Sequence, residues 1–232
     1  MKSFTGKKLL VFGDSIMYGS GNGGFGVGEY LKEKLGFHIA KYCIGGARVG
    51  FCNGKSWLVE QVRQAVLNKE TADVIVFDGF TNDCCISEES GLCDVPLGDA
   101  VKEKDCVDIF AVTERMNFSQ CFGSIALAFK KYFPVAGIVF VRPHKMGRRG
   151  DGVQKIYGER ATEICKMYGI AVADIYNDSG LDTFDCVQRD RYTADTYGWG
   201  KGDCTHPNAA GYIEKYMPLI EKEIFAAFGE KG

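Results

Sequence analysis

The chain has 232 residues, which suits one domain of ordinary size or at most two small ones. Apolar residues make up 46% and charged residues 25%, so the composition is that of a globular protein and not of a disordered one. The 28 basic and 30 acidic residues give a net charge of -2, and this balance argues against a nucleic-acid or anionic-membrane binder. No apolar run is long enough to span a membrane.

The first residues and the cysteines indicate the cellular compartment in which we expect the protein. Basic residues precede a short apolar run, Leu9–Phe12, which stops at Gly13 and is too short for an export signal. We therefore expect a cytoplasmic protein, and we expect most of its 10 cysteines to be reduced packing residues. No Cys-x-x-Cys pair occurs and the three histidines lie far apart, so we expect no metal site.

Apolar runs and amphipathic stretches alternate along the chain. In chain order they predict a strand at 8–12, a helix at 25–35, a strand at 38–44, a helix at 56–68, a strand at 72–77, a helix at 117–132, a strand at 136–141, a helix at 153–168, a strand at 170–173 and a helix at 207–228. Pro218 is expected to kink the last helix, because proline cannot donate a backbone hydrogen bond.

Strands that are apolar throughout and joined by helices favour a parallel sheet covered on both faces. We therefore predict an α/β fold: a single three-layer α/β/α domain over 1–232, doubly wound and flavodoxin-like, with about five parallel strands. Two segments interrupt the alternation: 84–116, which is rich in cysteine and acids, and 176–206, which is polar and aromatic. Each follows the end of a strand, so we expect both to be loop insertions over the ligand-binding edge.

Two glycine-rich stretches match nucleotide-binding motifs only in part. Gly19, Gly21 and Gly24 have the spacing of a dinucleotide fingerprint, but six residues separate the first strand from Gly19, and no acid ends the second strand. The stretch 53–56 resembles the end of a phosphate-binding loop, but Val49 stands where that loop requires its first glycine. We expect plain loops at both places and no nucleotide cofactor.

A serine and a histidine with a nearby acid are the first candidates for chemistry. Ser15 follows Gly13 and Asp14 at the end of the first strand, where a tight turn can present a serine hydroxyl. Asp203 lies three residues before His206, close enough to fix the tautomer of a histidine that accepts the serine proton.

The other two histidines are weaker candidates for the general base. His38 begins the second strand, at the wrong edge of the sheet, and His144 has no acid nearby in the sequence. An acyl-transfer site also needs donors for an oxyanion. Gly46, after the second strand, offers a backbone N–H, and Asn82, after the third strand, offers a side-chain amide. Taken alone, each also fits an ordinary turn residue.

Taken together, these residues resemble the SGNH/GDSL hydrolase family of esterases and lipases. The four sequence blocks of that family match, in order, the stretch 13–15, Gly46, the stretch 81–83 and the stretch 203–206, which together span nearly the whole chain. One departure is Phe80, which stands where the family has glycine. We expect Phe80 to turn into the core and Gly79 to take the unusual backbone conformation.

The resemblance implies a serine hydrolase that cleaves carboxylic esters through an acyl-enzyme, with no metal and no organic cofactor. Ser15 would be the nucleophile, His206 the general base and Asp203 its partner. The N–H groups of Ser15 and Gly46 and the amide of Asn82 would form the oxyanion hole.

The substrate is only weakly encoded. Candidate substrate-binding residues near the strand ends and in 176–206 are Asp14, Thr81, Asp83, Arg142, His144 and Trp199. Tyr192, Tyr197 and Trp199 offer rings for a sugar or an acyl chain, and the basic segment 142–149 offers charge for an anionic group. Local packing and solvated loop charges are the plain alternatives.

We expect a small-molecule substrate, a short acyl or acetyl ester of a carbohydrate or small alcohol. An acyl-CoA or acyl-carrier thioesterase with the same triad is one alternative, and a catalytically inactive glycan-binding module is another. The sequence indicates no nucleic-acid or membrane partner and no particular oligomeric state.

Overall fold

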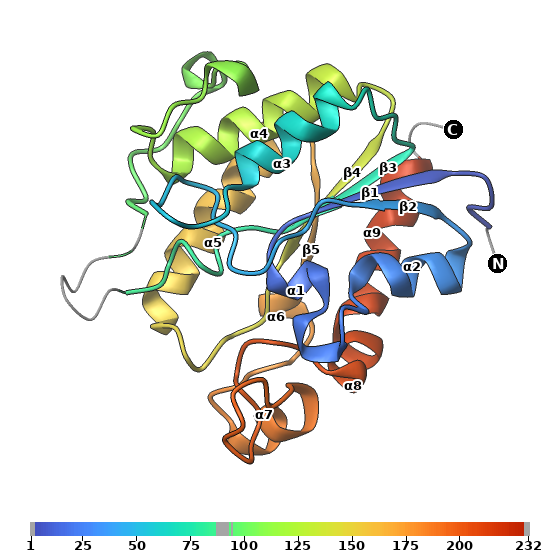
Figure 1. The fold of residues 1–232 in the computed structure, drawn as a ribbon, viewed down its shortest axis with the longest axis vertical. Coiled ribbons are helices and arrows are strands. Elements are labelled where there is room, and N and C mark those ends of the chain that lie inside the picture. The colour runs from blue at the N-terminus through green and yellow to red at the C-terminus, as the bar shows by residue number, and fades with distance from the viewer. Residues whose placement is uncertain (1–2, 87–92, 94, 230–232) are drawn as a thin grey trace.

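A computed structural model describes residues 3–86, 93 and 95–229 of the chain. Its centre is a single sheet of parallel strands in the order β2-β1-β3-β4-β5 (Figure 1). The strands are β1 Lys8–Phe12, β2 His38–Lys41, β3 Val74–Phe77, β4 Gly137–Arg142 and β5 Ala171–Asp174. The predicted α/β fold, with five parallel strands, is confirmed.

Helices cover both faces of the sheet (Figure 1). The helices are α1 Ser15–Tyr18, α2 Val27–Leu35, α3 Leu58–Leu67, α4 Phe118–Tyr132, α5 Asp151–Met167, α6 Ile175–Asp178, α7 Cys186–Tyr192, α8 Ala209–Gly211 and α9 Met217–Gly229. Short helical turns are η1 Ser20–Asn22, η2 Glu103–Asp105, η3 Ile109–Ala111 and the π turn η4 Tyr212–Tyr216. Side chains of α3, α4 and α5 pack on one face of the sheet, and those of α2, η4 and α9 pack on the other.

Alternation within the strands explains the two layers. In β1, Leu10 and Phe12 belong to the core under α3, α4 and α5, whereas Leu9 and Val11 belong to the core under α2 and α9. All four side chains are completely buried. Because successive strand residues point to opposite faces, a strand buried on both faces is apolar at successive positions, as β1 is from Leu9 to Phe12.

Several element boundaries differ from the prediction for local reasons. The first long helix begins at Val27 and not at residue 25, because Gly26 is extended and its N–H donates to the Glu29 carboxylate at 2.8 Å, which caps the helix. In the last helix, the π turn η4 directly precedes α9, whose second residue is Pro218. A widened turn accommodates a residue that has no N–H to donate.

The segment 84–116 lies partly elsewhere than expected. Ile109 and Val112 are buried in the core beside α3 and α4, and the Arg63 guanidinium donates to both of their carbonyl groups, at 2.9 and 2.7 Å. This half of the segment therefore packs on a helical layer and does not cover the ligand edge. The expectation for 87–92 and 94 lies outside the described residues. The segment 176–206 contains α7 and lies at the lower end of the molecule in Figure 1.

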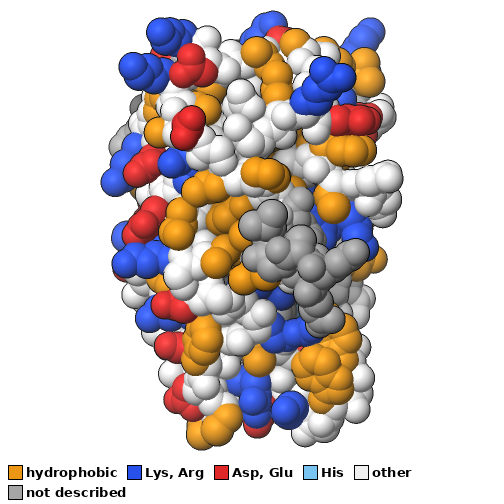
Figure 2. Space-filling model, turned by 90° about the vertical axis from the view of Figure 1, so that its left-hand side faces the viewer, with side chains coloured by type: hydrophobic (Ala, Val, Ile, Leu, Met, Phe, Trp, Pro, Cys, Tyr) orange, Lys and Arg blue, Asp and Glu red, His pale blue; other side chains and the backbone are white. Residues whose placement is uncertain are grey.

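All 10 cysteines are free thiols, and four of them are buried: Cys43, Cys84, Cys121 and Cys165. Within the described residues, no helix is long and apolar enough to cross a membrane. In the same part of the chain, no three His, Cys, Asp or Glu side chains gather as a metal-binding group would. Acidic and basic side chains are interspersed over much of the face in Figure 2, as the near-zero net charge leads one to expect.

Candidate active site

Ser15 lies where β1 passes into α1, at the carboxyl edge of the sheet. Asp14 caps this four-residue helix: its Oδ1 accepts the N–H of Ile16 at 2.8 Å. Ser15 is therefore the first helical residue, and only 7% of it is exposed. The sequence predicted the turn but not the helix, which is too short to show a periodic pattern.

The turn before Ser15 requires glycine. Gly13 has φ +140°, and a Cβ atom built on it would lie 2.0 Å from Oδ1 of Asp78. The side chain of Gln61 holds the turn, because it accepts the Gly13 N–H at 3.0 Å and donates to the Gly13 carbonyl at 2.9 Å. Sequence reasoning missed Gln61. Its signal is a polar residue among the apolar positions of the predicted helix 56–68.

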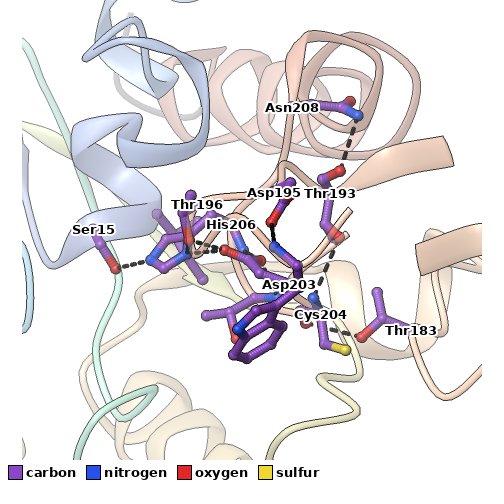
Figure 3. Close-up of polar contacts among 12 residues, drawn as sticks. Ser15, Thr183, Thr193, Asp195, Thr196, Asp203, Cys204, His206 and Asn208 are labelled. Carbon is purple, nitrogen blue, oxygen red and sulfur yellow. Dashed lines mark hydrogen bonds and ion pairs between the residues drawn. The ribbon is translucent and has the colours of Figure 1, made fainter. Parts of the chain in front are cut away.

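The structure brings Ser15, His206 and Asp203 into one hydrogen-bonded chain (Figure 3). Oγ of Ser15 lies 3.0 Å from Nε2 of His206, and Nδ1 of His206 lies 2.6 Å from Oδ2 of Asp203. A carboxylate can only accept, so Nδ1 of His206 carries the proton and Nε2 faces the serine as an acceptor. This is the tautomer that a general base for Ser15 requires.

Asp203 is completely buried, but both oxygens of its carboxylate accept hydrogen bonds. Its Oδ1 accepts the backbone N–H groups of Thr205 at 2.9 Å and His206 at 2.8 Å, and its Oδ2 accepts the hydroxyl of Thr196. Burial alone would raise the pKa of Asp203, but the hydrogen bonds from His206, Thr196 and Thr205 outweigh it and lower the pKa to about 2. Sequence reasoning missed Thr196, which lies in a loop with no motif.

The candidate oxyanion donors come from the next two strand ends. Gly46 has φ +76°, and its N–H donates to no acceptor within the described residues. Its neighbour Gly45 also lies close: a Cβ there would be 4.0 Å from that of Ser15. Nδ2 of Asn82 donates to the carbonyl of Ala47 at 2.9 Å and lies 3.3 Å from Oδ2 of Asp14. The hydrogen bond to Asp14 is long, so the second N–H of this amide is only weakly hydrogen-bonded.

Phe80 behaves only in part as expected. Its side chain does turn into the core, where it is completely buried and its ring lies 6.4 Å from that of Phe140. The expectation that Gly79 takes the unusual backbone was wrong, because Phe80 itself has φ +97°. Gly79 is needed for a different reason: a Cβ there would lie 2.6 Å from a methyl group of Val49.

Two buried carboxyl groups, those of Asp14 and Asp78, lie at the turn that carries Ser15. Oδ1 of Asp78 accepts the backbone N–H of Asp14 at 3.0 Å, and both side chains are at most 1% exposed. Burial raises the pKa of Asp14, and burial together with the neighbouring Asp14 charge raises the pKa of Asp78 well above its ordinary value. Asp78 is therefore the member that keeps a proton. Asp14 supports the turn and is not open to a substrate.

The remaining residues of the third-strand block are also structural. Oδ1 of Asp83 accepts the N–H groups of Val49 and Gly50, both at 2.9 Å, and burial raises the pKa of Asp83 to about 7. The backbone carbonyl of Thr81 accepts Nε of Arg149 at 2.9 Å. Both Thr81 and Asp83 are completely buried, so neither side chain is open to a substrate.

Arg142 and His144 lie in the interior and not in the site. The guanidinium of Arg142, a residue that is 4% exposed, pairs with Asp174 at 3.2 Å. Nε2 of His144 lies 3.2 Å from the carbonyl of Cys204 and Nδ1 lies 2.7 Å from the hydroxyl of Tyr216. Burial lowers the pKa of His144 to about 4, so this neutral ring braces the loop that carries Asp203 and His206.

The aromatic candidates separate into two groups. Tyr192 is 7% exposed, and its hydroxyl donates to Glu214 at 3.0 Å, so it is a packing residue. Tyr197 and Trp199 are 51% and 48% exposed, and the Tyr197 ring centre lies 6.5 Å from that of His206. Only these two rings of the three lie open beside the candidate base.

Comparisons with known proteins agree with this fold. The family model described as GDSL-like Lipase/Acylhydrolase family matches residues 11–212. A comparison with curated proteins found no match. Among solved structures, a catalytic mutant of an acetylxylan esterase from Geobacillus stearothermophilus is 17% identical, with a TM-score of 0.57 and coverage of 99% of this chain and 97% of that one.

Two further structures are similar over comparable lengths. A lipase/acylhydrolase from Enterococcus faecalis is 14% identical, with a TM-score of 0.57 and coverage of 97% of both chains. A phospholipase A1 from Streptomyces albidoflavus is 16% identical, with a TM-score of 0.57 and coverage of 94% of this chain and 99% of that one. These structures share the fold of this chain. The match to the lipase/acylhydrolase family model defines the protein as a carboxylic ester hydrolase. The chain belongs to the GDSL-like lipase/acylhydrolase family.

Proposed function

We propose that the protein hydrolyses carboxylic esters in two steps, through an acyl-enzyme on Ser15. The observation that carries this proposal is the hydrogen-bonded chain from Oγ of Ser15 through the His206 ring to Asp203, with distances of 3.0 and 2.6 Å. A serine hydroxyl is a weak nucleophile at neutral pH, and an adjacent base that removes its proton during attack makes it effective.

The first step forms the acyl-enzyme. His206 accepts the Ser15 proton as Oγ attacks the ester carbonyl, and ionised Asp203 stabilises the imidazolium. The tetrahedral intermediate then collapses, the bond to the alcohol oxygen breaks, and the alcohol leaves with the proton from His206. In the second step a water molecule gives a proton to His206 as it attacks the acyl carbonyl. The second tetrahedral intermediate collapses, His206 returns the proton to Oγ of Ser15, and the acid is released.

The negative charge that develops on the carbonyl oxygen needs preorganised donors. We assign this role to the N–H groups of Ser15 and Gly46 and to the side-chain amide of Asn82. The N–H of Ser15 belongs to the first residue of helix α1. The backbone of Gly46 is left-handed, and its N–H has no acceptor among the described residues. Donors held in this way cost little reorganisation during the reaction.

We place the acyl group on the side of Ser15 away from His206, toward the loop after β2. Ile44, next to Gly45, and Trp57 line a surface cavity of about 400 Å³. We propose that short acyl groups, acetyl first among them, occupy this side, and that a carbohydrate or small alcohol is the leaving group. The printed name of one structural neighbour, an acetylxylan esterase, supports this substrate class.

A panel of p-nitrophenyl esters with increasing acyl length tests the proposal, with acetyl-CoA and longer acyl-CoA esters as thioester counterparts. We expect kcat/KM to be highest for acetyl to butyryl esters and much lower for acyl-CoA. A preference for acyl-CoA would make the protein a thioesterase. No turnover of any ester, together with glycan binding, would make it an inactive binding module.

A further inference from the structure

An exposed cluster at the rim of the candidate site is formed by Arg148, Tyr197 and Trp199, which we call the rim cluster. The rings of Tyr197 and Trp199 stack with their centres 4.8 Å apart and their planes 22° from parallel. The guanidinium carbon of Arg148 lies 4.7 Å from the centre of the Tyr197 ring and 4.9 Å from that of the Trp199 ring. Hydrophobic and basic side chains lie side by side at the lower end of the face in Figure 2.

The loop that carries the two rings is fixed to the candidate triad. The carboxylate of Asp195 accepts the N–H groups of Trp199 and Gly200, both at 2.7 Å, and the hydroxyl of Thr196 donates to Asp203 (Figure 3). Gly198, between the two rings, has φ +70°. These contacts hold exposed rings in place, and a rigid aromatic surface binds a ligand at low entropic cost.

Among the described residues, Arg148 is a cation without an anionic partner. It is exposed, and no carboxylate of the described residues pairs with it; the Asp195 oxygens are occupied by the backbone of the loop. The first arginine of α7, Arg189, differs, because it is paired with Asp190 at 2.8 Å. An arginine held against aromatic rings presents its remaining donors to a carboxylate or phosphate.

The position of the rim cluster relative to His206 determines whether the cluster contacts the alcohol part or the acyl part of the ester. His206 gives its proton to the leaving oxygen, so the alcohol part of the substrate must lie on the His206 side of Ser15. The Tyr197 ring is on this side, 6.5 Å from the His206 ring between centres. We place the acyl group on the other side of Ser15, away from His206.

We infer that the rim cluster binds the leaving alcohol, and that this alcohol is a sugar ring carrying an anionic group, a carboxylate or a phosphate. The inference rests on the proposed esterase function of Ser15. The ring would stack on Trp199 and Tyr197, and its anionic group would pair with Arg148. A phosphate at the far end of a pantetheine arm fits less well, because the cluster lies next to His206, within reach of a ring bonded directly to the ester oxygen.

Matched acetyl esters test the inference by kinetics. The substrates are acetylated methyl glucoside, methyl glucuronide and glucose 6-phosphate; the first is neutral, and the other two separate a carboxylate from a phosphate. We expect kcat/KM to be about tenfold higher for one or both anionic esters than for the neutral one, and Arg148→Gln to bring this ratio close to one. Arg115→Gln, an exposed arginine outside the site, is the matched control and should keep the ratio.

Trp199→Ala provides a second arm. It should lower kcat/KM for the neutral and the anionic sugar esters alike, by about tenfold, because it removes ring surface and no charge. A wild-type ratio near one, or a ratio that Arg148→Gln does not change, would overturn the inference while ester hydrolysis itself persists. A preference for acyl-CoA over every sugar ester would overturn it as well.

Binding without turnover separates failure of the inference from failure of the esterase proposal. Calorimetric titration of Ser15→Ala with unacetylated methyl glucuronide, glucose 6-phosphate and methyl glucoside should show an anionic sugar binding about tenfold more tightly than the neutral one. Anionic preference in this titration with no hydrolysis in the wild type would contradict the esterase proposal and leave the rim cluster as a sugar site. Equal affinities would contradict the rim-cluster inference.

Discussion

The side-chain amide of Asn82 donates a hydrogen bond to the backbone carbonyl of Ala47 at 2.9 Å. Ala47 directly follows Gly46, so this bond ties the loop after β3 to the loop after β2 and holds the two candidate oxyanion donors at a fixed separation. We therefore assign two roles to Asn82: it donates to the oxyanion, and it positions the loop that carries Gly46.

Asn82→Ala should lower kcat by about a hundredfold to a thousandfold, the usual result of deleting one oxyanion donor. KM should stay within a few-fold, because the donor acts on charge that develops only in the transition state. Steady-state kinetics with p-nitrophenyl acetate measures both. Asn68→Ala, which removes an exposed amide bonded to Tyr42, is the matched control. A kcat within about threefold of the wild type would show that Asn82 is not an oxyanion donor.

Phe80 provides a test of backbone strain that does not depend on activity. Phe80→Ala and Phe80→Gly both remove the buried ring, at about 3–5 kcal/mol of unfolding free energy. Only glycine also relieves the left-handed backbone of φ +97°. Phe80→Gly should therefore be more stable than Phe80→Ala by about 1 kcal/mol. Urea unfolding of the two variants measures this difference, and an alanine variant of equal or higher stability would refute it.

The buried pair of Asp14 and Asp78 predicts a particular dependence of stability on pH. The folded-state pKa of Asp78 is raised well above its ordinary value of 3.8, so the folded chain holds this proton more tightly than the unfolded chain does. This tighter binding of the Asp78 proton contributes fully to the free energy of unfolding below pH 3.8. The contribution is lost as the pH rises through the raised pKa of the folded state. The wild type should therefore lose stability as the pH rises, because the buried Asp78 carboxyl then ionises.

Asp78→Asn keeps the shape and the acceptor for the Asp14 N–H but cannot ionise. Between about pH 5 and pH 9 its Tm should fall less than that of the wild type. Parallel thermal melts across this range test the assignment. Tm curves that run parallel, or a variant whose Tm falls more steeply, would mean that Asp78 does not carry the proton.

How far the sequence predicted the structure differs between the fold and the site. The five strands were predictable because short, mainly apolar runs alternate with amphipathic helical stretches, a pattern typical of a parallel sheet covered on both faces. Ser15, Asp203 and His206 were candidates from their position and spacing, and a resemblance over nearly the whole chain joined them into one site. Their catalytic roles stay predictions. Contacts between segments far apart in the chain, such as Gln61 with the Gly13 turn, follow from packing that no local pattern encodes.

The wrong expectations have a common physical source. Arg142 and His144 were interpreted by charge and position, but their burial and their pairing with Asp174 and Tyr216 depend on elements far away in the chain. The left-handed backbone of Phe80 is likewise maintained by the core around its ring, which outweighs the local preference for glycine.

The cysteines give a prediction about redox state. All 10 are free thiols in the structure, so dithiothreitol should change the Tm by less than about 2 °C. Thiol titration in denaturant without reductant should count 10 thiols per chain. A Tm that falls by many degrees in reductant, together with fewer titratable thiols, would show that disulfides contribute to stability and that the expected reducing compartment is wrong.

The central claim is that Ser15 is the nucleophile. The most direct test is labelling with a fluorophosphonate, followed by intact mass and peptide mapping, on the wild type, Ser15→Ala and the control Ser179→Ala. We expect one adduct per chain on Ser15 in the wild type and the control. Ser15→Ala should show no adduct and no esterase activity, with an unchanged Tm. An adduct at another residue, or full esterase activity in Ser15→Ala, would contradict the account.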